Sequence, residues 1–116
     1  MGEKTVADLD ESEFDRLAGA ALKRFAEALD EGLGAEADVD FSGGILTITL
    51  ESGGQYVLNK HAPNRQIWLS SPRSGASHYR FEAARGAWVD TRSGRVLAEV
   101  LAEELTAVAA GRLALD

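Results

Sequence analysis

The feature that most constrains the fold is a run of six short segments in which apolar and polar residues alternate, separated by turns rich in glycine, serine or proline. Alternation with a period of two predicts half-buried β-strands. The predicted strands span residues 37–41, 45–50, 55–60, 66–70, 77–82 and 87–90. Because the loops between them hold only three to six residues, antiparallel neighbours and a continuous meander are expected.

Segments with helical spacing flank this meander. In residues 14–29 apolar side chains recur every three or four positions, which predicts a helix with one apolar stripe. Asp8 or Asp10 is the predicted N-cap, and Gly32 or Gly34 is expected to end the helix.

A second helical stripe covers residues 96–108, with its glutamates lying off the stripe. Gly111 is predicted to end this helix, and Leu113 and Leu115 are expected to pack a short tail onto the core. The order helix, six strands, helix predicts an α+β two-layer sandwich, with both helices on one sheet face and the other face in water. With 116 residues in all, we expect a single domain spanning residues 1–116.

Composition excludes several classes of function. The chain has no cysteine, so disulfides, zinc–thiolate sites, iron–sulfur ligation by this chain and thiol catalysis are excluded. No apolar run approaches the roughly 18 residues of a membrane span. The first residues lack the character of a signal or transit peptide. A cytoplasmic protein is therefore expected, with a trimmed mature form as the alternative.

The net charge of −7 is unevenly distributed. Residues 1–40 hold 12 acidic and 4 basic side chains, whereas residues 41–116 hold 7 and 8. The first third of the chain therefore carries the whole acidic excess. Such a field repels nucleic acid and anionic lipid and attracts cations or basic proteins. Solubility is the simpler interpretation of the same charge.

One tryptophan is predicted to lie on the polar face of a strand. If Ile67 and Leu69 face the core, then Gln66, Trp68 and Ser70 face solvent. Residues of the neighbouring predicted strands continue this open face, namely Thr47, Thr49, Val57, Asn59, His78 and Arg80. Tryptophan, arginine and amide side chains are typical interface anchors.

This face has two other interpretations. Trp68 could simply cover its neighbours, since single exposed aromatic residues are common. Recognition of single-stranded RNA is disfavoured, because the face has few aromatic residues and the net charge opposes a phosphate backbone. The second tryptophan, Trp88, is predicted to pack in the core.

Several stretches resemble a known signature. They are YVLNK at 56–60, PN at 63–64, QIWLSSP at 66–72 and SG at 74–75, followed by Tyr79. Further matching stretches are LDE at 9–11, RLA at 16–18, GILT at 44–47 and AEEL at 102–105. Together they closely resemble the frataxin family, which includes the bacterial CyaY type, and they cover nearly the whole chain.

The resemblance implies a fold and a function. The family fold is an α-β sandwich with two terminal helices on one sheet face. The implied role is in iron–sulfur cluster biogenesis, as a non-catalytic regulator or iron chaperone. Iron, as Fe²⁺ or Fe³⁺, is expected to bind weakly to an acidic ridge formed by the first helix and first strand. The expected partners are the cysteine desulfurase and its scaffold protein, with a monomer as the resting state and an iron-induced oligomer as the alternative.

The resemblance also implies which residues bind the partner. Asn59, Gln66 and Trp68 match family positions that contact the assembly complex, with amide hydrogen bonds from the first two and an aromatic anchor from the third. Arg65 matches a position that is also basic in the family. His78 stands where mitochondrial relatives carry an arginine, a departure that would weaken the contact or make it pH-dependent.

The acidic ridge can bind iron because carboxylate oxygens are suitable ligands for this metal, while water supplies the remaining ligands. The candidate iron ligands are Asp10, Glu11, Glu13, Asp15, Glu27, Asp30, Glu31, Glu36, Asp38 and Asp40. Glu27 and Glu31 are four residues apart and share a helix face. Asp38 and Asp40 point the same way from one strand.

The sequence departs from the family ridge in the middle of the first helix. Gly19, Ala20 and Lys23 stand where relatives usually carry further acids, and Lys23 is placed to pair with Glu27. We therefore expect a split ridge whose stronger part comprises Glu27, Asp30, Glu31, Asp38 and Asp40. A charged face kept for solubility is the alternative.

Two other functions remain as alternatives. A ferroxidase-like iron oxidation and storage protein normally needs buried ligands such as Glu-x-x-His pairs, and the sequence has none. A metal-independent protein-binding sandwich would keep the open sheet face alone. The two histidines fall on different predicted elements, His61 in a turn and His78 on a strand, so a two-histidine metal site is not expected.

Overall fold

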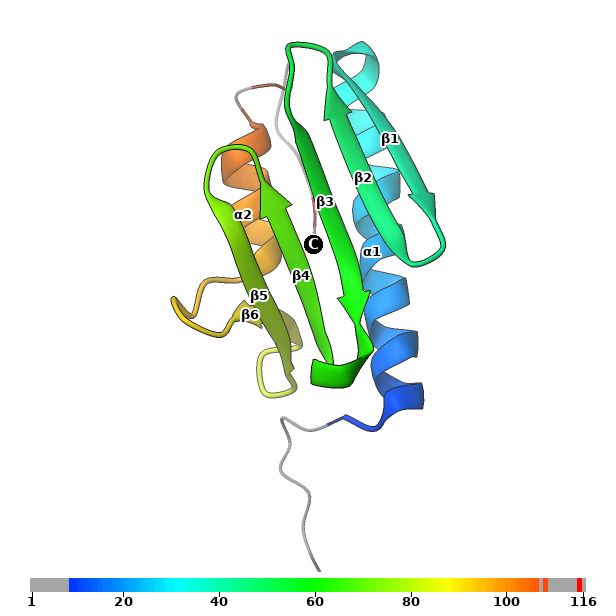
Figure 1. The fold of residues 1–116 in the computed structure, drawn as a ribbon, viewed down its shortest axis with the longest axis vertical. Coiled ribbons are helices and arrows are strands. Elements are labelled where there is room, and N and C mark those ends of the chain that lie inside the picture. The colour runs from blue at the N-terminus through cyan, green and yellow to red at the C-terminus, as the bar shows by residue number, and fades with distance from the viewer. Residues whose placement is uncertain (1–8, 107, 109–114, 116) are drawn as a thin grey trace, which may run out of the picture.

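The computed structural model describes residues 9–106, 108 and 115, which form two α-helices, two short 3₁₀ helices (η1 and η2) and one six-stranded sheet (Figure 1). The elements are α1 (Glu11–Leu33), η1 (Gly34–Glu36), β1 (Ala37–Ser42), β2 (Ile45–Leu50), β3 (Gln55–His61), η2 (Ala62–Asn64), β4 (Gln66–Ser71), β5 (Gly75–Glu82), β6 (Ala87–Asp90) and α2 (Leu97–Leu105). The strands pair antiparallel in sequence order from β1 to β6. Both helices lie behind the same face of the sheet (Figure 1), which confirms the predicted α+β sandwich.

The ends of α1 have clear physical causes. The carboxylate of Asp10 accepts a hydrogen bond of 2.7 Å from the backbone N–H of Glu13, so Asp10 is the N-cap. The helix ends at Gly34, whose φ of 54° is a conformation that favours glycine. No helix among the described residues is long and apolar enough to cross a membrane.

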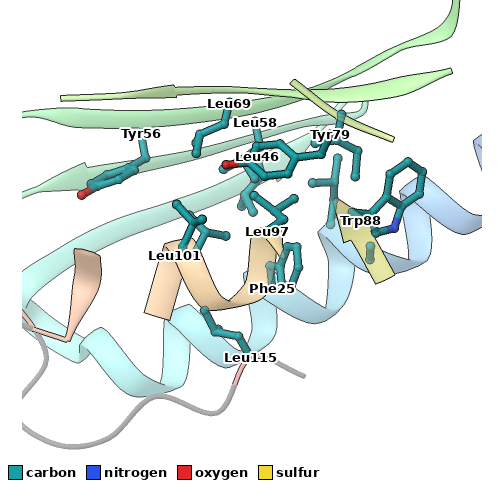
Figure 2. Packing of buried hydrophobic residues seen from close by; sticks show 14 of the residues in the cluster. Phe25, Leu46, Tyr56, Leu58, Leu69, Tyr79, Trp88, Leu97, Leu101 and Leu115 are labelled. Carbon is teal, nitrogen blue, oxygen red and sulfur yellow. The ribbon is translucent and has the colours of Figure 1, made fainter. Parts of the chain in front are cut away.

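The core fills the space between the helices and the sheet (Figure 2). Side chains from alternate strand positions, such as Leu46, Leu58 and Leu69, meet Leu97 and Leu101 of α2. Their complete burial is the main stabilising contribution, at roughly 1.5–3 kcal/mol for each side chain. The apolar side chains of the two helices and those at alternate strand positions therefore pack together in one apolar layer.

Trp88 is a core residue, as predicted. Its side chain is only 5% exposed. The ring packs edge to face against Phe14 of α1, with 5.9 Å between centroids, and against Phe81 of β5, at 5.3 Å. This geometry is favourable for aromatic pairs, and it ties α1 to the last two strands.

Four predicted strand boundaries were wrong, and two of the differences are small, since β1 and β4 each end one residue later than predicted, at Ser42 and Ser71. Strand β3 continues through His61, so this histidine lies in a strand and not in a turn. Strand β5 begins at Gly75, two residues earlier than predicted, because the Ser71 hydroxyl accepts the N–H groups of Arg73 and Ser74 and shortens the turn.

The C-terminal predictions had mixed outcomes. Helix α2 ends at Leu105, earlier than predicted, where the N–H of Thr106 bonds to the carbonyl of Ala102. Gly111 and Leu113 lie outside the described residues. Leu115 is buried in the core, as predicted.

Candidate docking face and acidic edge

The sheet register brings the predicted partner-binding residues together on the open face. Asn59, Trp68 and His78 lie opposite one another on β3, β4 and β5 and form one cross-strand row. His61, Gln66 and Arg80 form the adjacent row. We call these six residues the Trp68 face. Sequence reasoning had not assigned His61 to it, because the histidine was expected in a turn.

Trp68 is held between two histidine rings. The imidazole of His61 lies 3.7 Å from the indole at an interplanar angle of 8°, and that of His78 lies 4.3 Å away at 17°. Strands β3 and β5 flank β4 on opposite sides, so the two imidazoles cover opposite faces of the indole. Its Nε1–H donates a 2.8 Å hydrogen bond to Oε1 of Gln66.

His61 is held mainly by this stacking. Its Nδ1 atom is buried and has no hydrogen-bond partner among the described residues. Stacked aromatic pairs contribute about 0.5–1.5 kcal/mol beyond their buried area. Trp68 is therefore fixed by a stack on each face and a hydrogen bond at its edge, instead of lying loosely on the sheet.

Arg65 differs from the other predicted partner residues, because its guanidinium bonds to two backbone carbonyls. Its Nε donates to the carbonyl of Leu9 at 3.1 Å, and its Nη1 donates to the carbonyl of Ala62. The residue also has a φ of 52° and closes the η2 turn before β4. The structure thus gives Arg65 a fold-stabilising contact, while its role in partner binding stays a prediction.

The carboxylates of β1 share the open sheet face with Trp68. Asp38 lies opposite Thr49 and Asp40 lies opposite Thr47, and both threonines point away from the core. Strand β1 is the edge of the sheet, three strands from β4. The open sheet face therefore extends from the carboxylates of β1 at one edge to the stacked rings of Trp68 and the two histidines, and to Arg80, on β3–β5.

Three predicted iron ligands at the start of α1 already have partners in the fold, and Asp40 of β1 accepts a weaker hydrogen bond of 3.3 Å from the Ser42 hydroxyl. Asp10 caps α1, Glu13 pairs with Arg16 at 2.6 Å, and Asp15 pairs with Lys60 at 2.5 Å. Metal binding at these carboxylates would compete with those contacts. The first turn of α1 is therefore the less available part of the predicted ridge.

The remaining candidates are exposed, namely Glu11, Glu27, Asp30, Glu31, Glu36, Asp38 and Asp40. The expected ion pair between Lys23 and Glu27 is not formed. In the part of the chain that the structure describes, no group of three or more His, Asp or Glu side chains is placed to hold a metal ion. An ion at one or two of these carboxylates would keep most of its water ligands, and their assignment as ligands stays a prediction.

A polar network that sequence reasoning missed connects α2 to the sheet. The Glu104 carboxylate accepts hydrogen bonds from the hydroxyls of Tyr56 at 3.0 Å, Ser71 at 2.6 Å and Ser74 at 2.7 Å. The backbone carbonyl of Glu104 accepts a bond from Arg73 at 3.0 Å. The stretches that carry the resemblance, YVLNK, SSP, SG and AEEL, contain four of these five residues, but their common contact is visible only in three dimensions.

This network shifts two pKa values. Partial burial alone would raise the pKa of Glu104, but the three donated hydrogen bonds and the charge of Arg73 lower it below its ordinary value. Burial, followed by the hydrogen bond to Glu104, raises the pKa of Tyr56 to about 12. The network is thus most stable with a charged Glu104 and a neutral Tyr56.

The fold and its surfaces define a class of protein: a small α+β sandwich whose candidate functional side chains lie on an open sheet face and an acidic edge. A family model described as a frataxin-like domain matches residues 7–111. The chain therefore belongs to the frataxin family.

Named relatives support this assignment. The chain is 40% identical over 101 residues to mitochondrial frataxin of Arabidopsis thaliana, covering 84% of this chain and 54% of that protein, so it spans about half the length of that relative. It is 36% identical over 99 residues to the iron-sulfur cluster assembly protein CyaY of Neisseria meningitidis serogroup B, covering 85% and 89% of the two chains.

Solved structures agree with the fold. A frataxin from Psychromonas ingrahamii superposes with a TM-score of 0.80 at 27% identity, covering 93% of this chain and 99% of that chain. Trimeric frataxin from Saccharomyces cerevisiae, complexed with ferrous iron, superposes with a TM-score of 0.61 at 32% identity, covering 95% and 92%.

Proposed function

We propose that this chain acts in iron–sulfur cluster assembly, as a non-catalytic iron-binding protein that regulates a cysteine desulfurase–scaffold complex. The observation that carries the proposal is the fixed tryptophan on an open sheet face in a member of the frataxin family. A relative that spans most of the same length is named as an iron-sulfur cluster assembly protein.

The docking contact uses hydrogen-bonding groups that the fold leaves free. Gln66 accepts from the indole through Oε1, so its amide N–H groups remain available to donate. Asn59 donates from Nδ2 to the carbonyl of Lys60, so its Oδ1 remains available as an acceptor. Trp68 between them supplies the aromatic anchor that interface hot spots commonly contain.

Iron is the cargo of the proposed function and not a resident cofactor. Asp38 and Asp40 project from the same side of β1, while Glu27, Asp30 and Glu31 are exposed near the end of α1. Exposed carboxylates of this kind favour weak binding with easy release. Weak binding suits a donor that must transfer its iron to another protein.

The iron role is tested by an anaerobic Fe²⁺ titration followed by NMR. We expect signal broadening concentrated in residues 27–40. Glu27→Lys should weaken binding about tenfold, because it replaces an attractive charge by a repulsive one near the ion. Glu99→Lys makes the same charge change at an exposed position on α2 and is the matched control. Equal binding by the two variants would show that net charge alone attracts the metal.

The role in assembly is tested with a purified cysteine desulfurase and scaffold protein. Addition of this chain is expected to change the rate of cluster formation in a saturable way, as measured by the visible absorbance of the cluster. A rate that is the same with and without the chain, at every iron concentration, contradicts the proposed function.

A further inference from the structure

The two histidines determine which part of Trp68 a partner can touch. Because His61 covers one face of the indole and His78 covers the other, only the edge of the ring remains open. A nucleobase or an aromatic side chain therefore cannot stack on Trp68. A partner that binds here must interact with ring edges.

Ring edges have a definite electrostatic preference. An aromatic ring is negative over its faces and positive around its edge. Here three nearly parallel rings are stacked face to face, so their outward C–H edges form one weakly positive strip. Such a strip favours electron-rich groups, above all carboxylate oxygens.

The charges around the strip favour the same ligand. Arg80 lies in the adjacent row, opposite Gln66, and forms no ion pair with another described residue. The six residues of the Trp68 face include no carboxylate. The next acidic side chain along β5, Glu82, lies 3.2 Å from Arg85, which offsets its charge. This patch is therefore locally positive on a chain whose net charge is −7.

We propose that the Trp68 face binds an acidic segment of its protein partner, with a carboxylate against the ring edges and a second one near Arg80. His61 and His78 are positioning residues, because they hold the indole so that its edge faces the partner. Asp38 and Asp40, on the same sheet face at β1, repel the acidic segment and so restrict it to the β3–β5 side. This inference rests on the proposed function only in assigning a partner to this face.

The test uses two short synthetic peptides with blocked ends, one of alternating glutamate and alanine and one with glutamine in place of glutamate. Binding is followed by the indole N–H signal of Trp68 in ¹H–¹⁵N NMR spectra. We expect the glutamate peptide to shift this signal and the glutamine peptide to bind at least about tenfold more weakly. Equal binding of the two peptides, or no shift with millimolar glutamate peptide, would overturn the proposal.

Variants of the two histidines test whether their rings position the indole or whether the charge of the face alone attracts the peptide. His78→Ala and His61→Ala are each expected to lower the affinity for the glutamate peptide about threefold to tenfold. His78→Phe keeps a stacking ring and should therefore retain most of the wild-type affinity. Thr49→Ala, on the same sheet face near β1, is the control and should bind as the wild type does. Thermal unfolding midpoints establish that each variant is folded. Wild-type affinity in both alanine variants overturns the positioning role.

Failure of this inference is distinguishable from failure of the proposed function. If the peptides do not bind while the chain still changes the rate of cluster assembly, the acidic partner is refuted and the function stands. If the glutamate peptide binds but the assembly rate does not respond, the function is refuted and the surface preference stands. Binding of a short oligothymidylate in place of the glutamate peptide would contradict the proposed edge contact.

Discussion

Trp68→Ala is expected to reduce the effect of this chain on the rate of cluster assembly at least about tenfold, while the fold persists. Buried aromatic anchors commonly contribute 2 kcal/mol or more to an interface. The indole is half-buried on the open face and contributes nothing to the apolar layer between sheet and helices. The measurement is the rate of cluster formation with desulfurase and scaffold at increasing concentrations of variant.

Two comparisons control this experiment. Trp68→Phe keeps a ring between His61 and His78 but loses the indole N–H that bonds to Gln66, so an intermediate effect is expected. Thr49→Ala alters the same sheet face far from the stack and should behave as the wild type. An unchanged rate for Trp68→Ala would remove this face from the proposed function.

Glu104→Ala is expected to lower the free energy of unfolding by about 2–3 kcal/mol. The change leaves the hydroxyls of the buried residues Tyr56 and Ser71 without their acceptor, and an unsatisfied buried polar group costs about 1–3 kcal/mol. The exposed Ser74 can bond to water in place of the carboxylate. The measurement is equilibrium unfolding in urea. The neighbouring variant Glu103→Ala is the matched control, because the Glu103 side chain is exposed and pairs only with Arg95 at the surface. The decrease in the free energy of unfolding should be much smaller for this variant.

The same network predicts how stability depends on pH. The pKa of Glu104 is lowered in the folded state from its ordinary 4.5, so its stabilising contribution is present above pH 4.5 and is lost as the pH falls through the folded-state pKa. The pKa of Tyr56 is raised from 10.0 to about 12, so its contribution is lost as the pH rises from 10 towards 12. Glu104→Ala should flatten the acidic limb of the stability profile. An acidic limb of unchanged steepness would contradict the assigned role of Glu104.

The fold was largely predictable because its signals are local. Alternation identified every strand, the helix stripes identified both helices, and the placement of Ile67 and Leu69 in the core correctly put Trp68 on the open face. Errors fell at boundaries, where one side chain decides the outcome. The Ser71 hydroxyl shortens a turn by accepting two N–H groups, and the alternation pattern contains no information about that contact.

The candidate site was only partly predictable. Sequence reasoning and the family resemblance placed Asn59, Gln66, Trp68 and His78 on one face. The stack on Trp68 could not be predicted, because it depends on which residues of β3 and β5 lie beside position 68 of β4. A shift of one residue in either register would turn the histidines to the other face of the sheet.

The sequence by itself determined the elements of this protein, the face to which each strand residue points and the acidic excess of the first third, since each depends on neighbours along the chain. Only the tertiary structure decided that His61 and His78 enclose Trp68, that Glu104 gathers three hydroxyls, and that Asp15 is paired with Lys60. These contacts join residues from different elements. They depend on strand register and helix placement, which the packing of the whole core sets.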